Sequence, residues 1–343
     1  MNRERATPGP WCSGSSPRVS IVVPTYNRGP ALRATVEAIL RSRLDAVGAA
    51  ELIVVDDGSA APVDLVGVTP PTGFTVNLLR RSNGGPAAAR NSGFHAARGE
   101  FVLFVDDDIL VPPTLVEDHL AAHEQLPAAV VCGRCVLSPP SGPRALFDFL
   151  EGLGSDPGRD ALEPFVRIPI VASGQISLPR SICPAGEGAY REDLKTPGAE
   201  EFELSMRLRT RGVPIFLATR IQALHCQPVD IDSISRQQYK HGMGYAEAAI
   251  KCPETLGLPE LASVIEASRP PRWRAGVTAL ASPLLKSLAA SPPVRAGVLA
   301  LARAADRLPL SGRARAALYR AAISSHFVAG VRRGLRLYRG PQC

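Results

Sequence analysis

Residues 101–110 read FVLFVDDDIL. An apolar run without polar alternation predicts a strand that is buried on both faces, as in a parallel sheet. Three adjacent aspartates follow it, and carboxylates held so closely repel one another and raise each other's pKa. The segment therefore indicates either a solvated acidic turn or a place where a cation belongs, and the rest of the sequence bears on the choice.

Apolar strands of the same kind recur along the N-terminal half. They are predicted at Val19–Val23, Leu52–Val55 and Phe74–Leu79. Helices are predicted between strands, over residues 30–42 and 86–98, and Gly99 is expected to cap the second. Strands that alternate with helices predict an α/β fold, with a mostly parallel sheet flanked by helices.

The pattern loosens after residue 128. Further strands are predicted over residues 129–137, 165–178, 213–217 and 221–224. Helices are predicted over residues 200–211, which Gly212 would cap, and over residues 231–251. The predicted organisation is a disordered leader (1–16), an α/β domain (17–228), a helical extension (229–266) and a basic amphipathic helical tail (267–343).

The charge of the chain is unevenly placed. Residues 267–343 hold thirteen arginines and one lysine against one aspartate, a net charge of +13, which leaves −6 for residues 1–266. A basic amphipathic helix can lie on an anionic membrane surface. It can equally pack on the body of the protein or on a partner, and both interpretations stay open. No nucleic-acid-binding motif accompanies the charge, so nucleic acid is not expected as a partner.

The cysteines and the N-terminus bear on location. The seven cysteines are scattered and odd in number, which is typical of a reducing compartment. The first 17 residues lack the apolar core of a signal peptide. We therefore expect a cytoplasmic protein, with the inner face of the membrane as an alternative location through the tail.

Polar clusters follow three of the predicted strands. They read PTYNR at 24–28, DDGS at 56–59 and DDD at 106–108. Ligands of open α/β sheets gather at the carboxyl ends of the strands, so the clusters predict one crevice. In an extended segment Asp106 and Asp108 would point the same way and Asp107 away from them. Such a pair of carboxylates is suited to Mg²⁺ or Mn²⁺, which keep open positions for substrate phosphates.

Four ordered motifs, PTYNR, VVDDGS, NGGPAAARNSG and FVDDD, together resemble the family 2 glycosyltransferases with the GT-A fold, from about Val19 to His225. The resemblance implies an inverting transferase that binds a nucleotide-diphosphate sugar and uses Mg²⁺ or Mn²⁺. Asp108 would hold the metal on the diphosphate, with Asp106 facing the ribose or the metal and His225 as a further metal ligand. The implied donor-binding residues are Pro24, Thr25, Tyr26, Arg28, Asp56, Asp57, Asn83, Gly84, Arg90, Asp106 and Asp107.

The resemblance extends to a helix that carries the catalytic base. The family's helix begins with Glu-Asp, whereas this sequence reads EEFEL at 200–204 and so places Glu201 where an aspartate is usual. The longer side chain moves the carboxylate by roughly 1.5 Å, which matters for a base whose reach is about 2.6–3.2 Å. Glu200 is the alternative base. Gly174, Gln175 and Arg180 resemble the segment that lines the acceptor side.

The expected function is a metal-dependent transfer of a sugar to an acceptor hydroxyl on a glycan, a lipid-linked molecule or a small molecule. One alternative is a catalytically impaired sugar-nucleotide-binding protein, with Glu201 as its sign. A sugar-phosphate nucleotidyltransferase would need a Gly-rich basic loop after the first strand, and residues 24–27 (PTYN) are not one. No GxGxxG follows a strand and no GxxxxGK occurs, which excludes dehydrogenases and P-loop enzymes.

Overall fold

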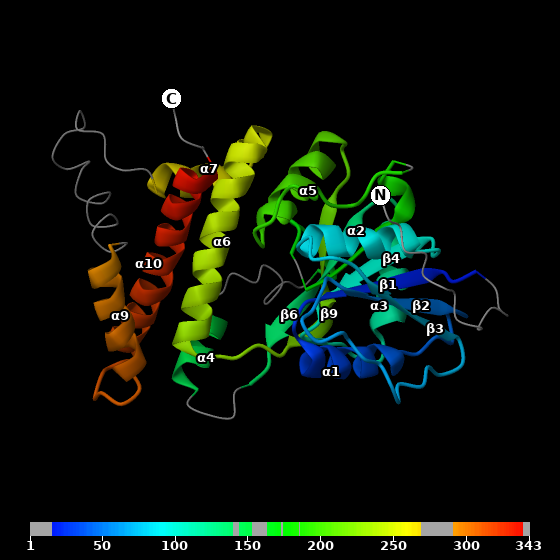
Figure 1. Cartoon of the computed structure of the whole chain (residues 1–343), viewed down its shortest axis with the longest axis horizontal. Helices are drawn as coiled ribbons and strands as arrows, with labels where there is room; N and C mark the ends of the chain where they lie inside the picture. The colour runs from blue at the N-terminus through cyan, green and yellow to red at the C-terminus, as the bar shows by residue number, and fades with distance from the viewer. Residues whose placement is uncertain are drawn as a thin grey trace. The chain divides into compact units, whose positions relative to one another are not determined.

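The computed structural model describes residues 16–139, 144–152, 163–172, 174–184, 186–268 and 291–338. The chain divides into two compact units, and each is described by itself (Figure 1). The first comprises Met1–Val136, Asp156–Glu192 and Arg207–Cys226, and the second comprises Leu137–Ser155, Asp193–Met206 and Gln227–Cys343. The predicted leader lies almost wholly outside the described residues.

A nine-stranded sheet forms the first unit, in the order β3-β2-β1-β4-β8-β6-β9-β5, with β7 paired to β9. Its parallel part contains the four strands that the sequence predicted in the N-terminal half. They are β1 (Val19–Thr25), β2 (Ala50–Asp56), β3 (Phe74–Arg80) and β4 (Phe101–Val105). These strands are apolar because both faces of the sheet are covered. The expected α/β fold is confirmed.

Each of the remaining strands has an antiparallel neighbour. They are β5 (Ile109–Leu110), β6 (Val130–Leu137), β7 (Phe165–Arg167), β8 (Gln175–Pro179) and β9 (Ile215–His225). The run 165–178 is two strands rather than the predicted one, and Gly174, with φ of +109°, directly precedes the second. The two strands predicted at 213–217 and 221–224 are one continuous strand, β9.

Helices cover the two faces of the sheet in this unit: α1 (Gly29–Leu40), α2 (Pro86–Ala96) and α3 (Leu115–Gln125). Figure 1 shows α2 on one side of the parallel strands and α1 on the other. Ile21 and Val23 pack in one core with Val36 of α1, while Val22, one residue between them, meets Gly93 of α2. The alternation of side chains along β1 thus serves both helices.

The sequence predicted that Gly99 caps α2, and this prediction was wrong. The helix ends at Ala96, and its C-cap, Ala97, is already extended. A Cβ atom on Gly99 would lie 2.6 Å from the backbone nitrogen of Ser20. The glycine is therefore required for the close approach of the chain to the start of β1.

The second unit is helical. Its helices are α4 (Ala145–Gly152), the first part of α5 (Ala199–Thr210), α6 (Ile231–Lys251), α7 (Pro259–Ser268), α9 (Pro292–Ala304) and α10 (Gly312–Tyr338). α6 and α10 pack closely because Gly242 faces the Phe327 carbonyl and Gly330 faces the Tyr239 carbonyl. Tyr319, 1% exposed, lies in a separate core of this unit. The sequence had separated 229–266 from 267–343, whereas the described parts of both belong to one unit.

The apolar side chains of α9 do not all face the core. Val298 packs against the core of the second unit, while Val294 and Leu301 are 42% and 53% exposed. Arg303 is paired with Asp232 at the start of α6. In the described part of the chain, every helix is too short or too polar to cross a membrane.

Candidate functional site

The polar clusters at 24–28, 56–59 and 106–108 meet at the carboxyl ends of β1, β2 and β4. The register sets Thr25 beside Asp56 at the last pair of β1 and β2. The Thr25 hydroxyl donates to Asp107 Oδ2 at 2.6 Å, which joins the end of β1 to the turn after β4. The three segments expected to form one crevice are therefore in contact, where an open α/β sheet binds its ligands.

The three aspartates do not alternate as strand residues. β4 ends at Val105, and the Ile109 N–H donates to the Asp106 carbonyl, so 106–108 form a turn. Asp107 and Asp108 both contact the Arg28 guanidinium, while Asp106 pairs with Arg90 at 2.9 Å. The expectation that Asp106 and Asp108 point together and Asp107 away was wrong, because it applied strand geometry to a turn.

His225 lies beside Asp108 as the sequence suggested. The β5–β9 pairing sets Ile109 opposite His225, and the Cys226 N–H donates to the Asp108 carbonyl. His225 Nε2 is 3.3 Å from Asp108 Oδ1. A carboxylate and an imidazole thus converge, although they lie 117 positions apart in sequence.

The cationic neighbours decide the charge of the acidic turn. Burial raises the pKa of Asp107 to about 6, and the Thr25 hydroxyl and Arg28 only partly offset it. Burial also acts to raise the pKa of Asp108, but His225 and Arg28 outweigh it and hold that pKa below its usual value. The protein therefore stabilises the ionised form of Asp108.

Asp108 and His225 are the side chains of this site that could bind a divalent cation. Within the described ranges, no group of three or more His, Cys, Asp or Glu side chains is arranged to hold a metal ion. Asp108 and His225 supply one carboxylate and one imidazole, and Mg²⁺ commonly takes one or two protein carboxylates and completes its shell with phosphate and water. The two residues fit a cation that is shared with a diphosphate. Asp106 is paired with Arg90.

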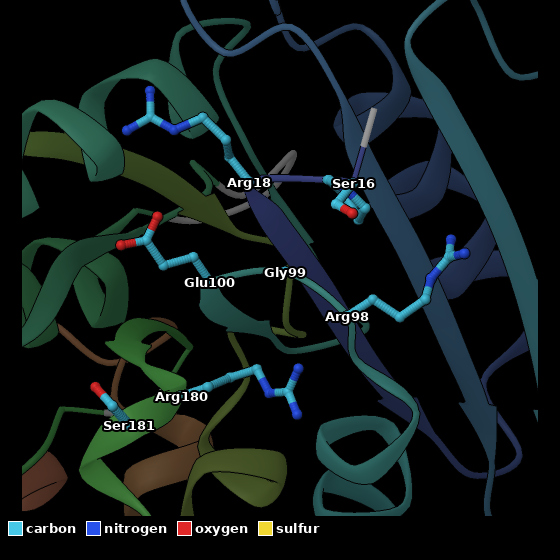
Figure 2. Close-up of a pocket in the computed structure, with 8 residues that line it drawn as sticks. Ser16, Arg18, Arg98, Gly99, Glu100, Arg180 and Ser181 are labelled. Carbon is cyan, nitrogen blue, oxygen red and sulfur yellow. The ribbon is translucent and has the colours of Figure 1, made fainter. Parts of the chain in front are cut away.

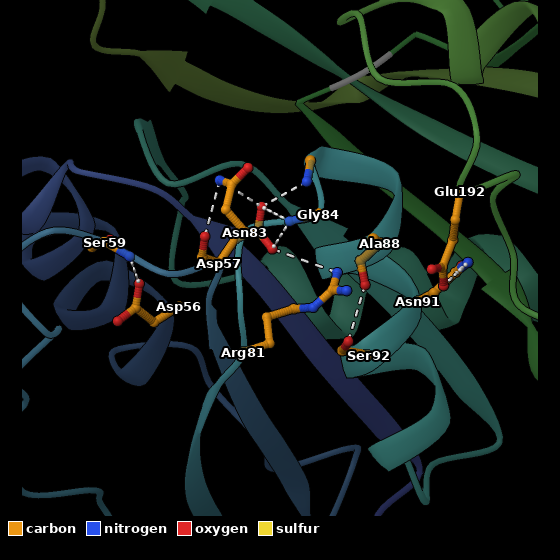
Figure 3. A network of polar contacts seen from close by, with 11 residues as sticks. Asp56, Asp57, Ser59, Arg81, Asn83, Gly84, Ala88, Asn91, Ser92 and Glu192 are labelled. Atoms are coloured by element: carbon orange, nitrogen blue, oxygen red, sulfur yellow. Dashed lines mark hydrogen bonds and ion pairs between the residues drawn. The ribbon is translucent and has the colours of Figure 1, made fainter. Parts of the chain in front are cut away.

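The second cluster shapes two loops (Figure 3). Asp56, 1% exposed, accepts from the Ser59 N–H at 2.8 Å and pairs with Arg80 at 2.8 Å. Asp57 accepts from the Gly84 and Gly85 N–H groups at 3.0 and 2.8 Å and from the Asn83 amide at 3.2 Å. Asp57, Asn83 and Gly84 thus come together as expected, whereas the Asp56 carboxylate faces the loop after β2.

Tyr26 is displayed on the turn that follows β1. It is 51% exposed, and the next residue, Asn27, has φ of +57°. Asn27 is held there because its N–H donates to the Ser59 hydroxyl and its side-chain oxygen accepts from the Ala60 N–H. An exposed ring at the carboxyl edge of a sheet is suited to stack on a base. Pro24, the residue before Thr25, is paired with Val55 of β2.

Arg90 connects the acidic turn to a segment that the sequence did not single out. Its guanidinium lies 5.3 Å from the Tyr190 ring centre and pairs with Asp106. Asn91 donates to the Tyr190 carbonyl at 2.7 Å and accepts from the Tyr190 N–H at 2.9 Å. Asn91, at the end of the NGGPAAARN run, is the sequence signal for this contact. Its partner could not be identified from the sequence, because Tyr190 lies 99 residues away.

The expected acceptor-side residues are divided between two edges of the sheet. Gly174 accepts from the Asp106 N–H at 3.0 Å, and Gln175 is paired with Val105, so both lie beside the acidic turn. Arg180 follows Pro179, which pairs with Phe101 at the start of β4. Because β8 runs antiparallel to β4, Arg180 lies at the opposite edge, in a cavity of about 500 Å³ that Arg18 and Glu100 also line (Figure 2). Arg180 was wrongly grouped with the crevice.

Gln175 is held by a chain of buried hydrogen bonds. Its amide nitrogen donates to the Arg134 carbonyl at 2.9 Å, so its oxygen faces His119 Nε2 at 3.3 Å and accepts. His119 Nδ1 then accepts from the Ser177 hydroxyl at 2.8 Å, and the Ser177 oxygen accepts from His123 Nε2 at 2.7 Å. Each hydrogen bond of this chain needs one donated proton, so His119 and His123 each carry a proton on Nε2 only and are neutral. Burial lowers the pKa of His119 to about 3 and of His123 to about 4.

The neutral histidine pair predicts acid-sensitive stability. Both pKa values are depressed on folding, so protonation favours the unfolded chain, and the contribution is complete above about pH 6.5 and is lost as the pH falls toward 4. Asp107, with a pKa raised to about 6, contributes in the opposite direction as a single group. We expect a loss of a few kcal/mol in unfolding free energy between pH 6.5 and 5 in urea titrations.

A His119→Gln variant tests this pH dependence. It should flatten the dependence of unfolding free energy on pH, while His95→Gln, at an exposed position on α2, should leave it unchanged. An equal slope in all three proteins would contradict the assignment to the buried pair.

Glu200 and Glu201 belong to the second unit. They form the first turn of α5, where carboxylates favour the positive end of the helix dipole. Glu200 is 2% exposed and Glu201 is half-buried. The Glu201 carbonyl accepts from the Ser205 hydroxyl at 2.6 Å, and Phe202 packs edge-on to Tyr245 of α6, with ring centres 4.4 Å apart. The described contacts fix the backbone of this turn.

Comparison with solved structures defines the class of fold. The mannosyltransferase of Pyrobaculum calidifontis, solved with GDP-Man and Mn²⁺, superposes with a TM-score of 0.59 at 19% identity, over 95% of this chain and 90% of that one. The fold is that of the GT-A glycosyltransferases. Residues 20–145 match the family model described as glycosyl transferase family 2.

Curated relatives match over part of their length. The validoxylamine A glucosyltransferase of Streptomyces hygroscopicus subsp. limoneus is 28% identical over 62% of this chain and 52% of its own. Glycosyltransferase GlyG of Streptococcus pneumoniae is 34% identical over 34% of this chain and 38% of its own. The chain thus spans about half, or less, of the relatives that it matches.

Proposed function

We propose that this protein is a metal-dependent, inverting glycosyltransferase that moves a sugar from a nucleoside-diphosphate donor to an acceptor hydroxyl. The observation that carries the proposal is the ionised Asp108 carboxylate, held between Arg28 and His225 where β1 and β4 end. The family match over residues 20–145 supports it, as do the donor and Mn²⁺ bound by the mannosyltransferase of the same fold.

The donor's nucleoside would be bound by the loops around Asp57. Tyr26 offers a ring for stacking, and the loop of Asn83 and Gly84 is fixed by its bonds to Asp57. The diphosphate would lie beside Asp108 and His225, which would hold Mg²⁺ or Mn²⁺, and Arg28 brings a further positive charge there. The bound cation would neutralise the charge that develops on the departing diphosphate.

The reaction itself is a single displacement. The Glu201 carboxylate takes the proton of the acceptor hydroxyl, and the hydroxyl oxygen attacks the anomeric carbon as the bond to the diphosphate breaks. One displacement inverts the anomeric configuration. Electrostatic stabilisation of the leaving diphosphate supplies a large share of the rate enhancement, with the Arg28 guanidinium as one donor of positive charge.

A non-catalytic sugar-nucleotide-binding protein is the second candidate, because Glu201 stands where the family has aspartate. It differs from the enzyme in turnover and not in donor binding. A nucleotidyltransferase is less favoured, since the chain after β1 turns at Tyr26 and Asn27 and forms no Gly-rich phosphate loop.

Calorimetry with UDP-, GDP- and dTDP-sugars, each with and without Mn²⁺, tests the proposal. One donor should bind at least ~10-fold more tightly with Mn²⁺, because the cation joins the diphosphate to Asp108. Release of the nucleoside diphosphate in the presence of candidate acceptors then separates the enzyme from the binding protein. Absence of metal-dependent uptake of every donor would refute the assignment.

We also propose a cytoplasmic protein whose basic C-terminal helices contact an anionic membrane surface. Arg313, Arg320 and Arg333 of α10 are exposed, and each basic residue near such a surface contributes about 1 kcal/mol. Sedimentation with vesicles that contain phosphatidylserine should therefore fall with rising salt and with glutamate at these three positions. Equal sedimentation with neutral vesicles would argue against recognition of an anionic surface.

A further inference from the structure

The segment that leads into α5 is gripped by a buried carboxylate of α6. Residues 193–198 form neither helix nor strand, and α5 begins after them with Ala199, Glu200 and Glu201. Glu247, 0% exposed, accepts from the Thr196 N–H at 2.8 Å and from the Lys195 N–H at 3.2 Å. All of these residues belong to the second unit.

Other groups of α6 and α10 hold the same segment. Lys251, one turn beyond Glu247, donates to Glu247 Oε1 and to the Asp193 carbonyl, each at 2.6 Å. Tyr338, near the end of α10, shares a hydrogen bond with the Thr196 hydroxyl. Gly244, one turn before Glu247, allows α6 to touch the Pro197 backbone, because a Cβ atom there would overlap the Pro197 carbonyl. Positions 244, 247 and 251 share one face of the helix.

Burying the Glu247 carboxylate costs stability unless it makes interactions that an apolar side chain cannot make. Burial of a charged group is unfavourable, and apolar replacements of buried ion pairs are often neutral or stabilising. Burial acts to raise the pKa of Glu247, but Lys251 and the two N–H donors outweigh it and lower that pKa. The ionised carboxylate can bind two consecutive backbone N–H groups, which fixes an irregular segment as packing alone would not.

We propose that Glu247 is a positioning residue for the start of α5, and through it for Glu201, with Lys251 and Tyr338 as its supports. The role rests on the proposed function for its catalytic consequence. It makes α6 and the end of α10 part of the support of the active centre, in addition to any contact with a membrane. A base must be held within a fraction of an ångström, and displacement by 1 Å can cost about 10²-fold in rate.

The test compares Glu247→Gln with Glu51→Gln. Glu51 is a matched buried carboxylate, also 0% exposed. It accepts from the Arg98 backbone N–H at 2.6 Å and forms an ion pair with the Arg98 side chain. It lies near the start of β2, whereas Asp56 lies at the end of that strand. Each variant is assayed for donor affinity, for kcat per donor-binding site and for hydrogen exchange. We expect Glu247→Gln to lower kcat ~10-fold or more at unchanged donor affinity, and to speed exchange at Lys195 and Thr196 about tenfold.

Glu51→Gln should keep both kcat per site and exchange over residues 193–205 at wild-type values. Tyr338→Phe removes the hydroxyl that is hydrogen-bonded to Thr196. It should lower kcat per site and speed exchange at Lys195 and Thr196, each by less than Glu247→Gln does. This variant provides the test if Glu247→Gln does not fold. Unchanged exchange over 193–205, or a kcat per site equal to that of Glu51→Gln, overturns the proposal. A wild-type protein that binds donor without turnover would refute the enzyme, while the exchange comparison would still decide whether Glu247 holds this segment.

Discussion

An Asp108→Asn protein should lose turnover by ~10³-fold or more while its fold is retained. The asparagine keeps the volume of the side chain and can still accept from Arg28, so we expect a melting temperature within a few degrees of the wild type. It removes the negative charge that the protein keeps ionised between Arg28 and His225. Calorimetry should accordingly show that Mn²⁺ no longer strengthens donor binding.

The control for this prediction is Asp118→Asn. Asp118 lies in the first turn of α3 and belongs to none of the three polar clusters that form the crevice, so its loss should change neither turnover nor the Mn²⁺ effect. Turnover of Asp108→Asn within tenfold of the wild type would show that the cation, if one is used, is held by other groups.

The strands and helices of the parallel half could be predicted because burial on both faces leaves a direct trace in sequence. β4 was predicted with its observed bounds, and α6 likewise from 231 to 251. The antiparallel half was predicted less well. The division at Gly174 and the continuity of β9 depend on which strands pair, and pairing is set by contacts between segments far apart in the chain.

The site was predictable at the level of which strand ends meet. The direction of individual side chains was not, because it depends on a turn and on long-range partners. Asp107 turns toward Thr25, 82 residues earlier, and Asp106 turns toward Arg90. Arg180 was misplaced for a related reason: a residue after an antiparallel strand lies at the other edge of the sheet, and the sequence does not state the direction of the strand.

Glu201→Gln should lower kcat by about 10²- to 10⁴-fold, the usual contribution of a positioned general base, at unchanged donor affinity. Gln has the same length as Glu and accepts hydrogen bonds, but it cannot take the proton of the acceptor hydroxyl at neutral pH. The substitution removes the proton acceptor and none of the expected donor-binding residues, so donor affinity measured by calorimetry should not change. Glu254→Gln, at an exposed position after α6, is the control.

Two further variants of the same turn decide how the extra methylene of Glu201 is accommodated. Glu200→Gln reports on the alternative base, and a loss in this variant alone would move the role to Glu200. Glu201→Asp restores the family's usual residue but withdraws the carboxylate by roughly 1.5 Å, which geometry predicts to be harmful if the backbone has adjusted to glutamate. We expect Glu201→Asp to lose about 10²-fold in kcat. An increase would mean that the start of α5, held by Glu247 and its neighbours, still has the position that suits aspartate.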